Sequence, residues 1–206
     1  DVYSPSNELI VNGNFQQGNT GFNSEYQYTT FNNTEGQYFI GVNPLSWNSA
    51  MTGCTDHSTG STNMMCANGS PVVNSKVWCQ TVNVATNTDY AFSTWLTTLT
   101  PGNLALLQFS INDVVLQQPF QAPTLPCEWQ NFYTIWNSGI NTSANICIVN
   151  KNTVAGANDF ALDDISFRSV SLKDSVYVVV VPPPTPTISG TLNFCQGNST
   201  TLTVAG

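Results

Sequence analysis

Short stretches of alternating apolar and polar residues recur along most of the chain, and helical periodicity is hard to find. The alternating stretches are residues 77–84, 89–96, 129–136, 145–150 and 160–167. Residues 104–111 form an apolar run that turns at Asn112 and Asp113. Gly, Pro, Asn and Asp punctuate the pattern every ~8–12 residues, which is the spacing of all-β sandwiches and barrels. We therefore predict an all-β fold in which each strand puts one side on a core.

The character of the sequence changes after about Val170. Residues 175–181 are a strand-like exit, and the Pro-rich segment 182–186 has the composition of a stiff, extended spacer. Residues 187–206 are similar to the first two strands of an immunoglobulin-like domain, which needs about 100 residues in full. We predict a module over residues 1–170, an exit and linker over 171–186, and the start of an incomplete immunoglobulin-like repeat over 187–206.

Charge is scarce in these 206 residues. Only 8% of them are charged, the formal net charge is −8, and Lys and Arg together number four. So few cations cannot neutralise a phosphate backbone, which argues against nucleic acid as a partner. They also exclude a polybasic membrane anchor. Hydrophobic residues make up 41% of the chain, enough to bury a core, and no run approaches the ~18 apolar residues of a membrane span.

Six cysteines without a CxxC motif or a Cys/His cluster indicate disulfides rather than zinc. Together with the neutral, Asn- and Thr-rich composition, they predict an extracellular protein. The start Asp-Val-Tyr-Ser-Pro lacks the Met and basic segment of a signal peptide, so we expect a mature form. Cys54 and Cys66 flank one loop and are the pair that we predict. Other pairings stay open, namely Cys79 with Cys147, or Cys127 with either of these. Cys195 belongs to the incomplete repeat, so at least one of the other five cysteines stays free.

The apolar parity of residues 160–167 flips between Leu162 and Asp163. A β-bulge at this point would restore one buried face and would bring a carboxylate to the edge of the core. An unpaired charge is costly there, and a cation would relieve that cost. The alternative is two solvated carboxylates, Asp163 and Asp164, at a strand end, with Arg168 as a partner.

Aromatic residues are the better lead to a function, because sugars stack their apolar C–H faces on Trp and Tyr rings. Trp95 has the opposite parity to Tyr90 and Phe92, and Trp136 has the opposite parity to Trp129 and Tyr133. Trp95 and Trp136 are therefore candidate sugar platforms, with Gln108 and Gln130 as polar neighbours. The alternative is that both indoles pack in the sandwich core.

Catalysis finds little support in the sequence. Asp56, His57 and Ser58 have the residue types of a nucleophilic triad, but a triad is normally assembled from distant segments. His57 is the only histidine, and neighbouring residues on a regular strand, such as Asp163 and Asp164, point to opposite faces. We therefore predict no enzyme activity, and we interpret residues 56–60 as a structured loop.

Three stretches together resemble a known family. They are NELIVNGNFQQG at residues 7–18, DHSTG at residues 56–60 and NDFALDDI at residues 158–165. These resemble the galactose-binding-like jelly rolls, which include many carbohydrate-binding modules. The version with DHSTG is similar to modules of large Bacteroidetes cell-surface adhesins that leave the cell by type IX secretion. The start of the tail, with FCQGNSTTLTVAG, is similar to the immunoglobulin-like repeats that follow such modules.

The resemblance implies an antiparallel two-sheet jelly-roll sandwich with a structural calcium where the N-terminal segment meets the last strand. The ligands it implies are Gln16, where the family has an acidic residue, and Asp56, Asp163 and Asp164. Calcium takes six to eight oxygen ligands, and an amide oxygen still coordinates, although the site loses one negative charge. Ser175, in the exit segment, resembles an O-glycosylation site of Bacteroidetes.

Three functions follow for testing. The first is a non-catalytic module of an adhesin that binds a polysaccharide and serves adhesion or gliding motility. The second is a structural or docking module for another protein of the export or motility machinery. The third is an accessory domain of a glycan-active enzyme.

Overall fold

The computed structural model describes residues 8–58 and 62–170, and near the C-terminus residues 185, 187–190, 193, 195–197, 199 and 201–205. The chain divides into two compact units between Lys173 and Asp174. Most of the predicted linker and the predicted glycosylation site Ser175 lie outside the described residues, and the predicted domain bounds remain predictions.

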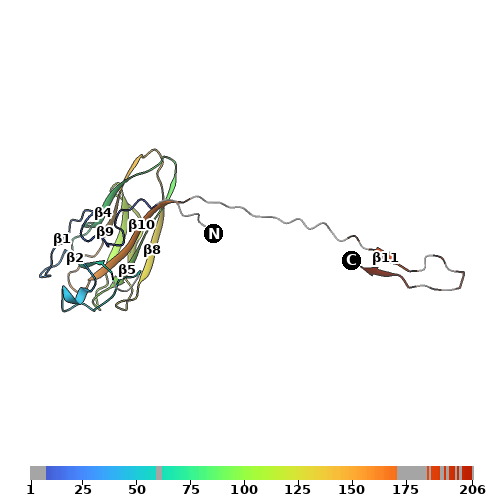
Figure 1. Cartoon of the computed structure of the whole chain (residues 1–206), viewed down its shortest axis with the longest axis horizontal. Helices are drawn as coiled ribbons and strands as arrows, with labels where there is room; N and C mark the ends of the chain where they lie inside the picture. Colours follow the sequence, from blue (N-terminus) through green and yellow to red (C-terminus); the bar gives the residue numbers. More distant parts are fainter. Residues whose placement is uncertain are drawn as a thin grey trace. The chain divides into compact units, whose positions relative to one another are not determined.

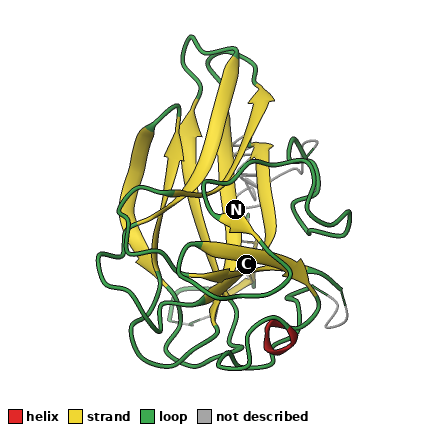
Figure 2. Cartoon of the chain, turned by 90° about the vertical axis from the view of Figure 1, so that its left-hand side faces the viewer, coloured by secondary structure: helices red, strands yellow, loops and turns green. Residues whose placement is uncertain are grey.

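Two sheets form the first unit, one of six strands and one of four (Figures 1 and 2). The six-stranded sheet has the order β1-β2-β3-β10-β5-β8, and the four-stranded sheet has the order β4-β9-β6-β7. The strands of the six-stranded sheet pair antiparallel, except for the two-residue parallel contact of β1 with β2. The strands of the first sheet are β1 (Gln27–Tyr28), β2 (Gln37–Gly41), β3 (Met64–Asn68), β10 (Phe160–Ser169), β5 (Asp89–Thr98) and β8 (Gln130–Asn137). Those of the second are β4 (Lys76–Asn83), β9 (Ser143–Asn150), β6 (Leu106–Ile111) and β7 (Val114–Gln121).

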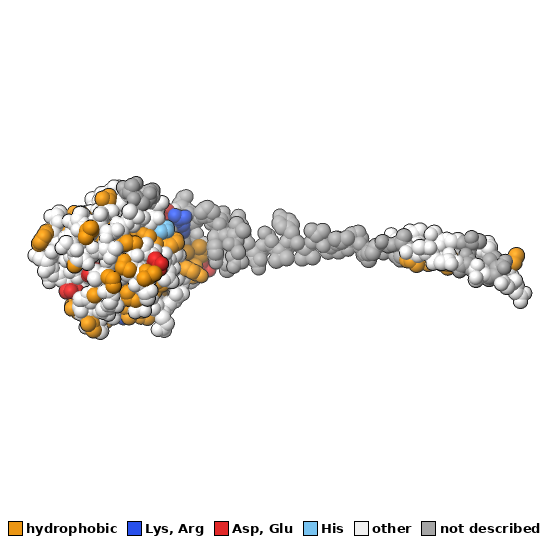
Figure 3. Space-filling model, turned by 90° about the horizontal axis from the view of Figure 1, so that it is seen from below, with side chains coloured by type: hydrophobic (Ala, Val, Ile, Leu, Met, Phe, Trp, Pro, Cys, Tyr) orange, Lys and Arg blue, Asp and Glu red, His pale blue; other side chains and the backbone are white. Residues whose placement is uncertain are grey.

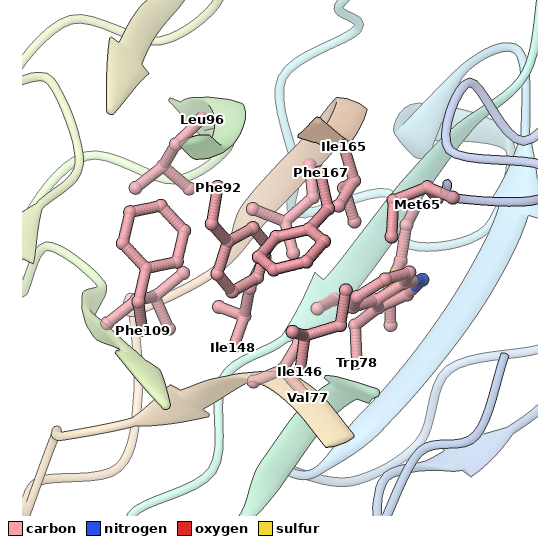
Figure 4. Close-up of a cluster of buried hydrophobic side chains, with 14 of the residues drawn as sticks. Met65, Val77, Trp78, Phe92, Leu96, Phe109, Ile146, Ile148, Ile165 and Phe167 are labelled. Carbon is pink, nitrogen blue, oxygen red and sulfur yellow. The ribbon is translucent and has the colours of Figure 1, made fainter. Parts of the chain in front are cut away.

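The main core fills the space between the two sheets. Figure 4 shows Phe92 and Leu96 of β5 facing Phe109 of β6 and Ile148 of β9. The rings of Phe92 and Phe109 lie 4.4 Å apart. These side chains are fully or almost fully buried, and burying one of them stabilises the fold by about 1.5–3 kcal/mol. The alternating stretches of the sequence therefore became the strands that face this core.

The predicted bulge in the last strand of the sandwich is confirmed. The pairing of β10 with β5 shifts register between Asp163 and Ser166, and Asp164 has a φ of 46°. Leu162 before the bulge and Ile165 after it both belong to the main core. The extra residue restores one buried face, as the flip in apolar parity required.

The outer face of the six-stranded sheet is covered over part of its length. Loop residues, including a short 3-10 helix at Pro44–Ser46, lie over β2, β3 and β10 and enclose a second apolar cluster. Figure 2 shows loops crowding the end of the unit where this helix lies. The cluster contains Trp47, Met51, Met64 and Leu99. Farther along this outer face, Tyr133 and Ile135 of β8 are exposed.

Two disulfides link parts of the chain that are far apart in sequence. Cys79 pairs with Cys147 across β4 and β9, which confirms one pairing that the sequence left open. The predicted pair of Cys54 with Cys66 is wrong, because Cys54 pairs with Cys127. The loop that carries Cys54 folds over the sheet and meets the segment before β8. Cys66 keeps a free thiol, and burial raises the pKa of that thiol well above its usual range.

The second unit contains an antiparallel pair of short strands, β11 (Thr187–Ser189) and β12 (Thr203–Ala205). Ile188 lies opposite Val204, and both side chains are exposed. Cys195 has a free, exposed thiol. The identity of this unit as an immunoglobulin-like repeat stays a prediction.

Candidate functional site

The loop that contains His57 is fixed to the outer face of the six-stranded sheet. The disulfide of Cys54 with Cys127 ties it to the segment before β8. The indole Nε1 of Trp129 donates to the carbonyl of Thr55 at 3.1 Å. The backbone N–H of His57 donates to Oδ2 of Asp163 at 3.0 Å. A covalent link and two hydrogen bonds thus set where the imidazole stands.

The imidazole of His57 lies against aromatic rings. It stacks on the indole of Trp95, with ring centroids 3.7 Å apart and ring planes 17° from parallel. Trp129 approaches it edge-on at 6.0 Å. Its Nδ1 lies 2.7 Å from Oδ2 of Asp164. Figure 3 shows the one histidine at the surface, beside hydrophobic side chains.

Asp163 is a buried carboxylate that accepts two backbone hydrogen bonds. Besides the N–H of His57, its Oδ1 accepts the N–H of Asp164 at 2.8 Å. Burial, and then the nearby charge of Asp164, raise the pKa of Asp163 to about 7, against the lowering effect of these two hydrogen bonds. The negative charge of Asp56 adds to the rise. The bulge therefore brings a carboxylate to the core edge, as predicted.

Each of the residues predicted to bind calcium makes hydrogen bonds within the protein. Asp56 is buried, and its carboxylate accepts from the backbone N–H and hydroxyl of Thr62 at 3.0 and 2.7 Å. The amide of Gln16 is exposed and donates to the carbonyl of Asn14. The carboxylate oxygens thus face N–H and O–H donors. Within residues 8–58 and 62–170, no group of three or more His, Cys, Asp or Glu side chains is arranged to hold a metal ion. The calcium prediction gains no support from this geometry and stays a prediction.

Two of the predicted sugar-binding residues do not lie on an open face: Trp136 packs against the core, and Gln108 is buried in β6. Trp136 packs against the main core beside Tyr90 and Phe167, so its prediction as an outward platform is wrong. The alternation along β8 assigns Trp136 and Tyr133 to opposite faces of the sheet, but it does not determine which face is buried. Gln108 is buried and its amide donates to the carbonyl of Gln117 at 2.6 Å, where β7 is irregular. Gln130 is exposed at the start of β8.

Trp95 does lie on the outer face, and strand register places other residues beside it. Trp95 pairs with Asn131, Ser93 with Tyr133, and Ala91 with Ile135. Tyr133 is 66% exposed and Ile135 43% exposed. Ser93 and Ala91 on the central strand are small, so the two large side chains lie beside a strip of small residues on this face.

The third strand of this face lies on the other side of this strip. Ser166 of β10 pairs with Ser93, and Arg168 pairs with Ala91. Arg168 donates to the carboxylate of Glu8 at 2.7 Å, and that carboxylate also accepts from the hydroxyl of Ser166. Several hydrogen bonds, including these, lower the pKa of Glu8 despite its partial burial. A pocket of about 360 Å³ between residues 8–14 and the bulge adjoins this side.

This surface is called the outer trough below, after the small side chains that lie between larger ones. Ala91 and Ser93 lie in its middle, Tyr133 and Ile135 on one side, Ser166 and Arg168 on the other, and Trp95 with His57 at one end. The sequence identified Trp95 but missed Tyr133 and His57 as site residues. The parity of residues 129–136 contained the signal for Tyr133. No signal in the sequence places His57 over Trp95, because that contact depends on the fold of a loop.

Solved structures with the same fold include carbohydrate-binding modules. The xylan-binding CBM22-1 domain of Xyn10C from Paenibacillus barcinonensis has a TM-score of 0.52 at 13% identity, covering 81% of this chain and 97% of that domain. TmCBM61, solved with β-1,4-galactotriose, has a TM-score of 0.51 at 14% identity, covering 79% and 98%. No family model and no curated protein sequence matches the chain.

Enzymes share this fold as well. A Stig cyclase from Fischerella sp. TAU, solved with an indole compound, has a TM-score of 0.53 at 11% identity and covers 80% of this chain and 98% of the cyclase chain. At such identities the likeness establishes the fold and not the ligand or the activity. The first unit is thus an all-β jelly-roll sandwich of the kind found in carbohydrate-binding modules.

The two disulfides of the first unit are consistent with an extracellular protein. Within the described part of the chain, no helix is long and apolar enough to cross a membrane.

Proposed function

We propose that the first unit is a non-catalytic carbohydrate-binding module that takes a polysaccharide in the outer trough. The observation that carries the proposal is the exposed ring of Tyr133 beside a strip of small residues on a jelly-roll sheet. A sugar ring can lay its C–H face on the phenol. Its hydroxyls then meet the amide of Asn131 and the hydroxyls of Ser93 and Ser166.

Charge favours a neutral glycan over an anionic one. The chain has a formal net charge of −8 and only four Lys and Arg residues. Asp164 lies at the end of the trough, and Arg168 is already paired with Glu8. A uronic acid or a sulfated sugar would therefore meet negative charge without a free cation to bind it.

The wider role that we propose is that of a secreted cell-surface adhesin, serving adhesion or gliding motility. This part rests on the sequence resemblance. A second candidate is a docking module for another protein of the export or motility machinery, which the apolar side of the trough at Tyr133 and Ile135 would also suit. An accessory domain of a glycan-active enzyme ranks third, since the described residues offer no further feature in its favour.

A binding assay with matched variants tests the proposal. The probes are xylohexaose, β-1,4-galactotriose and an array of neutral and anionic glycans. Tyr133→Ala is expected to weaken binding by about tenfold or more, because burying a large apolar side chain contributes about 1.5–3 kcal/mol. The control is Phe31→Ala, which removes a ring that is 72% exposed in the β1–β2 connection.

The outcomes separate the candidates. Retention of a neutral glycan by the Phe31 variant and its loss by the Tyr133 variant support the module. If no glycan on the array binds the wild-type chain, the carbohydrate proposal fails. Recovery of a stoichiometric protein partner from envelope extract, lost in Tyr133→Ala, would then favour docking.

A further inference from the structure

The indole of Trp95 is not an open platform for a sugar. The imidazole of His57 covers it at a centroid distance of 3.7 Å, with the two rings nearly parallel. A ring covered at van der Waals distance has no room for a sugar on that side. If the outer trough binds a glycan, the group that meets it at this end is therefore the imidazole, and Trp95 is its support.

Several contacts fix how the imidazole is oriented. The backbone N–H of His57 donates a hydrogen bond to Asp163, and the ring Nδ1 lies 2.7 Å from the carboxylate of Asp164. A carboxylate beside Nδ1 requires a proton on that nitrogen, which leaves Nε2 as the second polar atom of the ring. Within the described residues Nε2 has no hydrogen-bond partner, and the His57 side chain is 25% exposed. A ring held by stacking and by a carboxylate is preorganised, so little rotamer freedom is lost on binding.

The spacing along β5 suits one sugar ring. Trp95 and Ser93 are two residues apart on the same face of β5. His57 stacks on Trp95, and Tyr133 pairs with Ser93. Two residues of a strand span about 7 Å. A pyranose stacked on Tyr133 would therefore present the hydroxyls of one edge toward the imidazole.

We infer that His57 is the polar specificity contact of the outer trough, with Nε2 accepting a hydrogen bond from a sugar hydroxyl, and with Trp95 and Asp164 as its positioning residues. This inference rests on the proposed function and adds a ligand requirement to it. The glycan must carry a free hydroxyl on the edge next to the ring stacked on Tyr133.

The single histidine makes the inference directly measurable. In the wild-type chain with ¹⁵N-labelled histidine, we expect NMR to show the Nδ1-protonated tautomer. Addition of the glycan that Tyr133→Ala fails to bind should shift the Nε2 resonance. Both spectra are recorded at pH 8.

Two variants complete the test. His57→Phe keeps a ring on Trp95 but lacks Nε2, and it should bind the glycan about tenfold more weakly, the loss expected for one hydrogen bond. Monodeoxy analogues should identify one hydroxyl whose removal weakens wild-type binding by a similar factor and leaves His57→Phe unchanged. Asp164→Asn should populate the tautomer that is protonated on Nε2, and should weaken glycan binding by a smaller factor than His57→Phe does. It serves as the test variant if circular dichroism shows that His57→Phe is not folded.

Each outcome decides the inference. If glycan binding persists unchanged in His57→Phe while Tyr133→Ala abolishes it, the inference is overturned and the proposed function stands. An unshifted Nε2 resonance at saturating glycan has the same meaning. If no glycan on the array binds the wild-type chain, both are overturned.

Discussion

Asp163 should make the first unit less stable as pH rises through neutrality. Its folded-state pKa is raised from 3.8 to about 7, mainly by burial. The folded state therefore holds the proton more tightly than the unfolded state does. Stability is greatest below the unfolded value and is lost as pH rises toward the folded one.

The magnitude follows from the two pKa values. Between pH 5 and pH 8 the unfolded carboxylate is ionised throughout, while the folded one changes from protonated to ionised. Each pKa unit corresponds to about 1.36 kcal/mol, so the unfolding free energy should fall by roughly 2–3 kcal/mol over this range. Burial also raises the pKa of Glu35 and Asp159, and their effect has the same sign. The lowered pKa of Glu8 acts only under more acidic conditions.

Urea unfolding at pH 5, 6, 7 and 8 in the presence of a chelator measures this change, and Asp163→Asn isolates the residue. At pH 5 the variant should be close to wild type in stability, because the protonated carboxyl of the folded wild type, like an amide, has a single carbonyl oxygen to accept from the two N–H donors. Its stability should depend less on pH by roughly 2–3 kcal/mol over the range. An equal pH dependence in the two proteins would refute the assignment to Asp163.

Further predictions concern the disulfide, the cation, the core and the thiols. Replacing Cys54 and Cys127 by Ser should cost roughly 4 kcal/mol in urea unfolding, because the bond closes a loop with a sequence separation of 73; an unchanged midpoint would contradict this. Chelator should lower the melting temperature by several degrees if calcium binds only the folded state, as the calcium prediction requires, whereas an unchanged midpoint would count against that prediction. Trp136→Ala should destabilise the fold by about 3 kcal/mol without changing glycan affinity of the folded protein, and a selective loss of binding would count against its place in the core. An aromatic disulfide reagent should label the Cys195 thiol at once and that of Cys66 only on unfolding; two fast thiols would show that Cys66 is accessible.

The alternation of apolar and polar positions located some strands closely. Residues 77–84 and 89–96 became β4 and β5 within one or two residues at each end. β3 was missed because Met64–Asn68 is buried on both sides, under the covering loops and over the main core. A strand buried on both sides shows no alternation and cannot be told from other short apolar runs.

The candidate site was only partly predictable. Period-two parity placed Trp95 on the opposite face from Phe92, and this holds. On β8, large side chains occur on both faces, so parity alone could not decide that Trp136 points inward and Tyr133 outward. The disulfide of Cys54 joins two loops, and loop contacts leave no periodic signal in a sequence.

The β-bulge explains how one residue can be held by two consecutive carboxylates. On a regular strand Asp163 and Asp164 would point to opposite faces of the sheet. With Asp164 at a φ of 46°, both side chains reach His57 from across the chain, one at its backbone N–H and the other at its ring. The conformation costs free energy, because a non-glycine residue at positive φ is strained and a buried carboxylate is poorly solvated. A solvated loop tip would need neither feature. Their shared consequence is a fixed imidazole at the end of the outer trough, which is why we place the specificity of this module at His57 rather than at Trp95.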